Sequence, residues 1–304
     1  MKIRIGTRRS HLARTQSGTV AEWLTAQGHE TEFVMITTSG DASDAPYFSA
    51  IGPHGVFVRE VEQALINKTI DIAVHSYKDL PTSLPSELTV AAVPSRIDPA
   101  DTLLIRADQI DPKSGFLPVQ KKATVGTSSA RRQAWVKHLR PDVHVESLRG
   151  NVPTRIQRLR EGHYDAILLA NAGIERLQSS QLIDAPKLNL DDFVRVRLDS
   201  SVFVPAPAQG AIALQCRRDD EHIRETLAPL DEPITRGAVD AERRLLSHME
   251  GGCELAFGSL CENNQNQSVM IAMIKHKGQI LQKTVRGAEP MDLADRLANL
   301  LVET

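Results

Sequence analysis

The sequence predicts an α/β protein with two doubly wound lobes and a small α+β domain at the C-terminus. Short apolar strands alternate with amphipathic helices up to about residue 218, which is the rhythm of α/β folds. The length of 304 residues exceeds what one compact core usually holds. From Asp219 the pattern changes to two helices, two strands and a closing helix, which indicates a separate smaller domain.

The first lobe begins with a strand, a helix and a second strand. Its predicted elements are strands at 3–6, 32–37, 71–75 and 88–93 and helices at 12–26 and 56–67. A further apolar strand at 211–216 comes after the second lobe in the sequence, and we expect it to complete the first sheet. The first domain is therefore predicted to be discontinuous.

The second lobe follows a break rich in proline at 94–99. Its predicted strands lie at 102–106, 123–126, 144–147 and 166–170, and each of the last three leads into a helix. The segment 194–201 is the expected return crossing. Predicted strands of the third domain lie at 269–275 and 279–285, and its closing helix begins at Met291. The resulting domains are 1–96 with 197–217, 97–196, and 218–304.

Composition places the chain in the ordinary soluble class. Hydrophobic residues make up 41% and charged residues 24%, and no apolar run approaches the length that spans a bilayer. The N-terminus lacks the apolar stretch of a secretory signal, so we expect a cytoplasmic protein. Three cysteines at these spacings predict neither a disulfide framework nor a zinc site. The net charge of −2 argues against a broad nucleic-acid surface.

Arginine dominates the basic residues and points to anion binding. It accounts for 25 of the 36 basic residues. Its planar fork binds carboxylate or phosphate oxygens in pairs. A salt-bridged surface explains the same composition equally well, so the positions of the arginines must decide.

Three strand-to-helix junctions carry polar clusters where open α/β sheets place ligands. The clusters read Gly-Thr-Arg-Arg-Ser at 6–10, Gly-Thr-Ser-Ser-Ala-Arg-Arg at 126–132, and Leu-Arg-Gly-Asn-Val-Pro-Thr-Arg at 148–155. Arginine in a first helical turn opposes the helix dipole, which makes sense if an anionic ligand neutralises it. Capping plus surface charge explains any single cluster, but three at equivalent positions favour anion sites. The nucleotide-binding glycine motifs do not occur at these junctions.

Asp79 follows the strand 71–75 and is the strongest catalytic candidate. Among arginine anchors, one carboxylate stabilises positive charge on a substrate or moves a proton to a leaving amine. A turn-forming role before Pro81 is the alternative. Lys78 is conceivable as a Schiff-base amine, although nothing local favours its desolvation. His75 is interpreted as a strand residue with its hydrogen bonds satisfied.

Cys253 lies in the glycine-rich segment Gly-Gly-Cys-Glu-Leu-Ala-Phe-Gly at 251–258, directly after a long predicted helix. The glycines let the backbone bend and leave room beside the sulfur. A thiol in this setting is predicted to be presented to a bulky group.

Together these motifs resemble the porphobilinogen deaminase (hydroxymethylbilane synthase) family over nearly the whole chain. The resemblance also rests on 73–81, Pro-Ala-Gln-Gly at 207–210 and Glu-Gly-Gly-Cys at 250–253. It implies lobes similar to type II periplasmic binding proteins. It further implies a transferase that joins four porphobilinogen molecules head to tail, releases ammonia, and then releases linear hydroxymethylbilane by hydrolysis. The implied protein is a monomer of tetrapyrrole and heme biosynthesis that needs no metal, membrane or nucleic-acid partner.

The resemblance also assigns residues. It makes Asp79 catalytic and makes Cys253 the thioether anchor of a dipyrromethane cofactor. The residues implied to contact that cofactor are Lys78, Asp79, Thr127, Ser128, Ser129, Arg131, Arg132, Arg149, Gly150, Gly173 and Gln209. Those implied to contact substrate are Arg8, Ser10, Arg149, Arg155 and Arg176.

Two departures from the family pattern and three alternatives accompany this hypothesis. Ala256 replaces a usual proline, so the turn after Cys253 is expected to be less rigid. His54 replaces a common lysine in a loop, which predicts a pH-dependent charge there.

The alternatives are a non-catalytic two-lobed polycarboxylate-binding protein, an inactive paralogue, and a thiol-redox or metal protein. A polycarboxylate receptor has no use for an exposed cysteine, and a redox protein needs a second cysteine at suitable spacing.

Overall fold

The computed structural model describes residues 2–37, 58–182, 187–249, 255–264 and 267–302. Two compact units emerge from the pattern of internal contacts. The first comprises Met1–Ile97, Ser179–Ala185 and Ala211–Arg236, and the second comprises Asp98–Gln178, Pro186–Gly210 and Gly237–Thr304. His54 and Cys253 lie outside the described residues.

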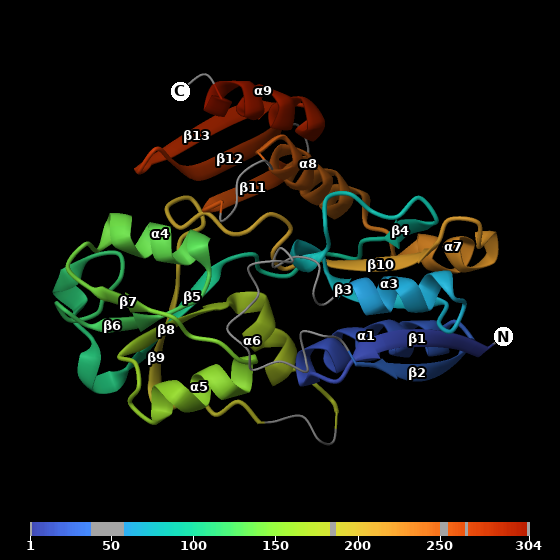
Figure 1. Ribbon diagram of the computed structural model, residues 1–304, viewed down its shortest axis with the longest axis horizontal. Helices are drawn as coiled ribbons and strands as arrows, with labels where there is room; N and C mark the ends of the chain where they lie inside the picture. Colours follow the sequence, from blue (N-terminus) through green and yellow to red (C-terminus); the bar gives the residue numbers. More distant parts are fainter. Residues whose placement is uncertain (1, 38–57, 183–186, 250–254, 265–266, 303–304) are drawn as a thin grey trace. The chain divides into compact units, whose positions relative to one another are not determined.

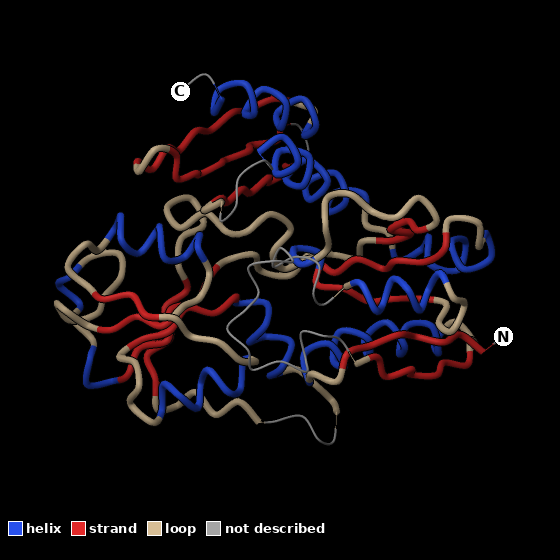
Figure 2. Tube along the Cα trace, in the orientation of Figure 1, coloured by secondary structure: helices blue, strands red, loops and turns tan. Residues whose placement is uncertain are grey.

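The first unit is built on a five-stranded sheet with the order β2-β1-β3-β10-β4 (Figures 1 and 2). The strands are β1 (Lys2–Arg8), β2 (Glu30–Ile36), β3 (Ile72–Ser76), β4 (Leu88–Ala92) and β10 (Ile212–Arg217). β1 pairs in parallel with β2 and β3, whereas β10 runs antiparallel to both β3 and β4. The late strand therefore joins the two halves of the first sheet, as the discontinuous first domain requires.

Helices cover both faces of this sheet because its inner strands are apolar on both sides. They are α1 (His11–Ala26), α3 (Arg59–Ile66) and α7 (Glu221–Leu227), with the 3₁₀ turns η1 (Tyr77–Asp79) and η4 (Ala228–Leu230). In β3, Ile72 and Val74 pack with α1 and α7, and Ala73 packs with α3 on the opposite face. Because alternate side chains of β3 point to opposite faces, helices bury the strand on both faces, as in a doubly wound sheet.

The second unit carries a five-stranded sheet with the order β7-β6-β8-β5-β9. Its elements are β5 (Asp101–Arg106), η2 (Ala107–Gln109), η3 (Pro112–Ser114), β6 (Thr124–Gly126), α4 (Ala130–Leu139), β7 (His144–Glu146), α5 (Val152–Arg160), β8 (Ala166–Ala170), α6 (Asn171–Gln178) and β9 (Phe193–Arg197). β6 is parallel to β7 and β8, and β5 is antiparallel to β8 and β9. α4 covers one face, and α5 and α6 cover the other.

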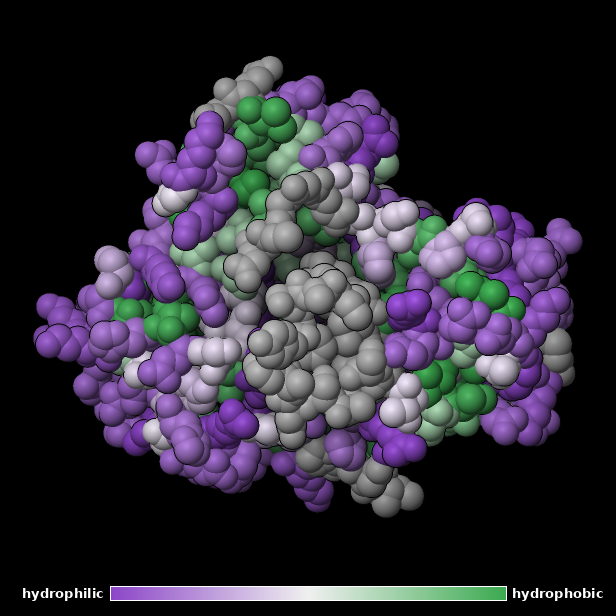
Figure 3. Space-filling view, in the orientation of Figure 1, coloured by the Kyte–Doolittle hydropathy of each residue, from purple (hydrophilic) through white to green (hydrophobic). Residues whose placement is uncertain are grey.

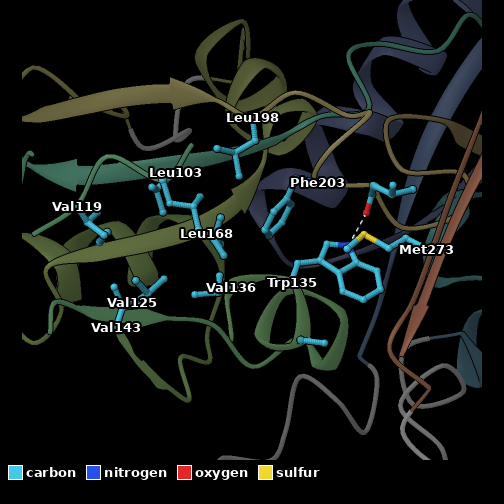
Figure 4. Packing of buried hydrophobic residues seen from close by; sticks show 14 of the residues in the cluster. Leu103, Val119, Val125, Trp135, Val136, Val143, Leu168, Leu198, Phe203 and Met273 are labelled. Atoms are coloured by element: carbon cyan, nitrogen blue, oxygen red, sulfur yellow. Dashed lines mark hydrogen bonds between the residues drawn. The ribbon is translucent and has the colours of Figure 1, made fainter. Parts of the chain in front are cut away.

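A third sheet belongs to the second unit, with the order β11-β12-β13. Its elements are α8 (Pro233–Met249), β11 (Phe257–Asn264), β12 (Gln267–His276), β13 (Gln279–Gly287) and α9 (Pro290–Val302). In β12, Ile271 and Met273 join the core that contains α4, and the alternate residues Met270 and Ala272 pack with α8 and α9. In Figure 4, Trp135 of α4 lies beside Phe203 and Met273. The third sheet is therefore packed on both faces.

The structure corrects the predicted elements at two places. The segment 194–201 is not only a crossing, because residues 193–197 form the edge strand β9. The C-terminal domain has a strand, β11, that the sequence pattern did not predict. The observed division of the chain also differs from the three expected domains, since α7 lies with the first unit and the third sheet lies with the second.

One face of the described surface is mainly hydrophilic. Figure 3 shows hydrophilic residues over most of the face it draws, interrupted by scattered apolar patches. Exposed large apolar side chains include Phe33 and Met35 on the edge strand β2. None of the described helices is both long enough and apolar enough to pass through a bilayer.

Candidate functional site

The first unit gathers its predicted site residues at one edge of its sheet. Arg8 ends β1, and Lys78 and Asp79 follow β3. β1 and β3 are parallel neighbours, so their carboxyl ends meet at the same edge. A hydrogen bond of 2.9 Å from Gln16 Nε2 on α1 to Ser76 Oγ links the two junctions.

Ser10 caps the helix that follows Arg8. Its Oγ accepts the Ala13 backbone N–H at 3.3 Å, which makes it the N-cap of α1. The capping interpretation of this junction is therefore correct for Ser10. The helix N-terminus beside Arg8 still favours negative charge through the orientation of its peptide dipoles.

Asp79 is exposed because its neighbours are held in the core. Tyr77 and Leu80 are 5% and 2% exposed, and the Tyr77 N–H donates to Ala211 O of the strand-leading segment at 3.0 Å. The Leu80 N–H donates to Tyr77 O at 3.3 Å and closes the turn η1. A short turn anchored at both ends thus presents a carboxylate to solvent at a fixed position.

Next to this turn in the sequence, His75 begins a chain of hydrogen bonds through Gln215 to Glu62, in which His75 and Gln215 are buried and Glu62 is half-buried. Gln215 Nε2 donates to Glu62 Oε1 at 2.9 Å, so Gln215 Oε1 is the acceptor for His75 Nε2 at 3.0 Å. This arrangement fixes the tautomer of His75 with its proton on Nε2. Burial lowers the pKa of His75 to about 4, opposed by the Gln215 hydrogen bond and assisted by the charge of Arg8. His75 is thus neutral at pH 7, in agreement with its interpretation as a satisfied strand residue.

In the second unit, the turn between β6 and α4 carries three hydroxyl groups, of which that of Thr127 is buried and those of Ser128 and Ser129 are half-buried. Ser129 Oγ accepts the Arg132 N–H as N-cap of α4, and Thr127 Oγ1 accepts the Ser129 N–H at 3.3 Å. Ser128 Oγ donates to Leu148 O at 2.8 Å and also lies 2.8 Å from Ser147 Oγ. Ser128 therefore ties this turn to the one that follows β7, the parallel neighbour of β6.

Arg131 and Arg132 converge on one buried carboxylate, that of Asp101. Arg131 Nη1 lies 2.7 Å from Asp101 Oδ2, and Arg132 Nη2 lies 2.6 Å from Asp101 Oδ1. Burial alone would raise the pKa of Asp101, but the two guanidinium charges hold it well below its usual range. Asp101 therefore neutralises part of the arginine charge that was expected to be matched by an anionic ligand. Two cations against one anion still leave an excess of positive charge in this trio.

Gln209 completes the Asp101 cluster. It is 1% exposed, and its Nε2 lies 2.7 Å from Pro99 O and 3.1 Å from Asp101 Oδ1. Arg131 and Arg132 also donate to main-chain oxygens of Val204 and Leu168, at 2.9 and 3.1 Å. The guanidinium planes are consequently held at fixed orientations.

The remaining predicted anion-site residues lie after β7 and on α6. Arg149 and Gly150 are exposed, and Gly150 has φ +107°, a conformation that favours glycine. Arg155 Nε donates to Gly150 O at 2.6 Å, while Asn151 is the N-cap of α5. Arg176 Nη2 donates to Gly210 O at 2.8 Å, and Gly173 is buried in the same helix. Burial lowers the pKa of Arg176 to about 10, opposed by Glu175, so this arginine stays charged at pH 7.

The residues present fit a dipyrromethane, which carries several carboxylate groups. Within the second unit they supply hydroxyl donors, exposed or half-buried arginines, and the excess charge beside Asp101. Cys253, which the family resemblance predicts as the anchor, lies between the end of α8 at Met249 and the start of β11 at Phe257 in the sequence.

Asp101 is a site residue that the sequence analysis missed. A signal was present, because an aspartate at the head of a strand with an apolar centre at 103–105 is unusual. Among the described residues, no cluster of three or more His, Cys, Asp or Glu side chains has the arrangement of a metal site.

The chain matches one family model over most of its length. Residues 3–225 match the model described as porphobilinogen deaminase, dipyromethane cofactor binding domain. The chain belongs to the porphobilinogen deaminase family. Members of this family are transferases of tetrapyrrole biosynthesis, and the matched domain is the one that binds the dipyrromethane cofactor.

Curated relatives of the porphobilinogen deaminase family match almost end to end. The porphobilinogen deaminase of Brevibacillus brevis is 38% identical over 306 residues, covering 99% of this chain and 94% of the relative. That of Syntrophobacter fumaroxidans is 40% identical over 294 residues, covering 95% and 89%. The match thus includes the third sheet, which the family model does not reach.

Two solved structures show a weaker likeness to the chain. The periplasmic VFT2 domain of BvgS from Bordetella pertussis gives a TM-score of 0.43 at 14% identity, covering 75% of this chain and 85% of that one. An ancestral cationic amino acid solute binding protein gives 0.43 at 14% identity, covering 80% and 93%. At these values the fold description rests on the strand orders observed in the chain itself.

Proposed function

We propose that this member of the porphobilinogen deaminase family acts as a hydroxymethylbilane synthase in which Asp79 is the catalytic residue and Cys253 carries the primer. Four porphobilinogen molecules are joined head to tail, each with loss of ammonia, and water releases the linear product. The dipyrromethane, when bound, supplies the pyrrole position to which the first substrate is joined. The observation that carries the proposal is the exposed carboxylate of Asp79 at a sheet edge that it shares with Arg8.

Asp79 is suited to stabilise a cation. Loss of ammonia leaves positive charge on the substrate pyrrole, and a fixed carboxylate beside a pyrrole N–H lowers the energy of that charge. The anchored turn around Asp79 means that little reorganisation is needed. Arg8 and Ser10 at the neighbouring strand end are proposed to bind substrate carboxylates, with the α1 N-terminus adding favourable dipole interactions.

The arginines of the second unit are proposed to hold the acetate and propionate groups of the primer and of the growing chain. Arg131 and Arg132 are fixed by Asp101, whereas Arg149 is exposed in the β7–α5 turn and Arg155 is half-buried on α5. Guanidinium groups keep their charge when a ligand displaces water. The residues proposed to contact the cofactor are Lys78, Asp79, Thr127, Ser128, Ser129, Arg131, Arg132, Arg149, Gly150, Gly173 and Gln209. Those proposed to contact substrate are Arg8, Ser10, Arg149, Arg155 and Arg176.

Intact-protein mass spectrometry tests the anchor. Purified wild type is expected to be heavier than its sequence mass by two linked pyrrole units, and Cys253→Ser to have the sequence mass and no activity. Cys261→Ser is the matched control, because Cys261 is a buried thiol and its loss leaves the anchor in place. An unmodified and inactive wild type contradicts the proposed function and supports a non-catalytic binding protein.

We also propose that the protein is a cytoplasmic monomer acting on a small molecule. The family resemblance supports both statements, and the two buried free thiols, Cys216 and Cys261, suit a reducing compartment. Light scattering after size exclusion tests the monomer, since a mass twice that of the chain contradicts it.

A further inference from the structure

Glu242 is a buried carboxylate whose two oxygens bind the backbone at two distant points of the second unit. It is 0% exposed and lies on α8. Its Oε2 accepts the Ala208 N–H at 2.6 Å, and its Oε1 accepts the Cys261 N–H on β11 at 2.8 Å. Burying a carboxylate is costly unless its oxygens are well paired, so an acid at this position implies a specific need for two acceptors.

The position of Glu242 on its helix makes that need clearer. Ala238, Ala241 and Leu245 on α8 pack against the third sheet with Cys261. Helical spacing places Glu242 on this same apolar face. An apolar residue there would leave the Ala208 and Cys261 N–H groups without this carboxylate, and unpaired buried donors are destabilising.

The first donor, Ala208, holds Gln209 in place. Ala208 is 0% exposed and has φ +57°, in the left-handed region that alanine adopts at a cost. The conformation of Ala208 sets the direction of the next residue, Gln209, whose amide reaches Asp101. Because Asp101 orients Arg131 and Arg132, the hydrogen bond from Glu242 supports the whole arginine cluster.

The second donor, Cys261, belongs to the strand that follows the cofactor-anchoring position. α8 ends just before Cys253 in the sequence, and β11 begins just after it. Glu242 therefore binds together the two elements that flank the anchor, which lie side by side in Figure 1.

Further contacts join the residues just before Ala208 to β11. The Ser259 N–H donates to Pro205 O at 3.0 Å, and Val204 O accepts Trp135 Nε1 and Arg131 Nη1, both at 2.9 Å. Residues 204–209, here called the linking segment, thus connect β11 with α4 and with Asp101. Glu242 holds this segment at its left-handed residue.

We propose that Glu242 is a positioning residue that keeps the elements flanking Cys253 in register with Gln209 and the Arg131–Arg132 pair. This inference rests on the proposed function, because it assigns Cys253 and the arginines to the same primer. It adds that productive attachment of the primer depends on a carboxylate that touches neither primer nor substrate.

The test follows covalent attachment. Protein made without its primer is incubated with porphobilinogen, and the rate at which Cys253 gains pyrrole units is followed by intact mass. In Glu242→Gln the shape is kept, but one acceptor oxygen becomes an N–H₂ group facing a donor. We expect attachment to slow by about tenfold or more, as is typical of losing a charge-assisted hydrogen bond that orients a site.

The matched control is Leu297→Ala in α9, a core change in the same domain that does not involve the linking segment. Both variants are expected to lose thermal stability, but only Glu242→Gln slows attachment, measured well below the melting temperature of either. Equal attachment rates in the two variants overturn the inference. Wild type that gains no pyrrole units at all instead contradicts the proposed function.

A second pair of variants separates positioning from simple destabilisation. Glycine adopts φ +57° without strain, so Ala208→Gly added to Glu242→Gln is expected to recover part of the attachment rate. No recovery contradicts the role assigned to Ala208. Should Glu242→Gln fail to fold, Glu242→Asp keeps both oxygens with a shorter reach and is read by the same assay, where a wild-type rate overturns the inference.

Discussion

His75 shows how a single buried residue makes the stability of the chain depend on pH. Its imidazole is buried, is hydrogen-bonded to Gln215 and interacts electrostatically with the positive charge of Arg8. The pKa of His75 is lowered to about 4, against about 6.5 in the unfolded chain. Between these values the unfolded chain binds the proton and the folded chain does not, so stability is lost as the pH falls.

The first prediction concerns this residue. Lowering the pH from 6.5 to 4 should destabilise wild type by up to about 3 kcal/mol more than His75→Gln. Urea unfolding at pH 6.5, 5.5 and 4.5 measures the difference. His144→Gln, at an exposed histidine, should follow wild type. Parallel pH profiles for wild type and His75→Gln would mean that His75 titrates normally in the folded chain.

The second prediction concerns Asp79. Because the proposed role is charge stabilisation by an exposed carboxylate, Asp79→Asn should lower product formation by about 10²- to 10⁴-fold without changing the melting temperature. Glu225→Gln, at an exposed acid on α7, is the isosteric control and should keep wild-type activity. Near-normal turnover in Asp79→Asn would remove its catalytic role.

At the residue scale, exposed and capping residues can be predicted from the sequence more readily than the buried residues that fix other side chains in place. Asp79, Ser129 and Asn151 follow strand ends, so their exposure or capping role follows from local spacing. Asp101 and Glu242 act through partners more than 15 positions away in the chain, such as the pairs Asp101–Arg131 and Glu242–Cys261. The local sequence pattern around Asp101 or Glu242 therefore does not indicate those partners.

At the scale of elements, β11 is the clearest feature that sequence reasoning did not find. Its residues Phe257–Asn264 contain a glycine and several polar side chains, so they lack the alternation of a half-buried strand. The strand forms because it pairs along its full length with β12. Tertiary pairing overrides a weak local preference here.

Gly258 on β11 gives the third prediction. A Cβ at this position would lie 2.6 Å from Val204 O and 2.8 Å from Pro205 O, so the linking segment would have to move. Gly258→Ala should destabilise the protein by about 1–3 kcal/mol. Gly237→Ala on α8, where a Cβ meets nothing within 4 Å, should be neutral or stabilising. Thermal melting of the two variants checks this, and equal melting temperatures would contradict the packing argument.

At the scale of the whole molecule, the three cysteines report on the cofactor. Cys216 and Cys261 are buried thiols, and burial raises the pKa of Cys216 to about 11. If Cys253 holds its primer through a thioether, guanidinium-denatured wild type should show two reactive thiols. Protein made without primer should show three. Titration with a chromogenic disulfide counts them, and three thiols in active protein would contradict a thioether anchor.

The predicted layers were correct, but the segment 194–201, predicted as a crossing, also contains most of the edge strand β9. Alternation of strands and helices predicts two α/β lobes because each strand needs cover on both faces. It does not reveal that residues 193–197 pair with β5, since an alternating polar edge strand resembles a crossing segment. Nor does it show that the third sheet packs against the core around α4.

The antiparallel strand β10 has a consequence for the order of events during synthesis. It separates β3 from β4 in the finished sheet, yet more than 100 residues of chain are made between β4 and β10. Until residue 217 has been made, β4 has no neighbour among the described strands of that sheet, whereas the strands β5 to β9 are already complete. The later lobe can therefore close its sheet before the earlier one, and nascent chains stalled short of β10 should expose the apolar edge of β3 to chaperones.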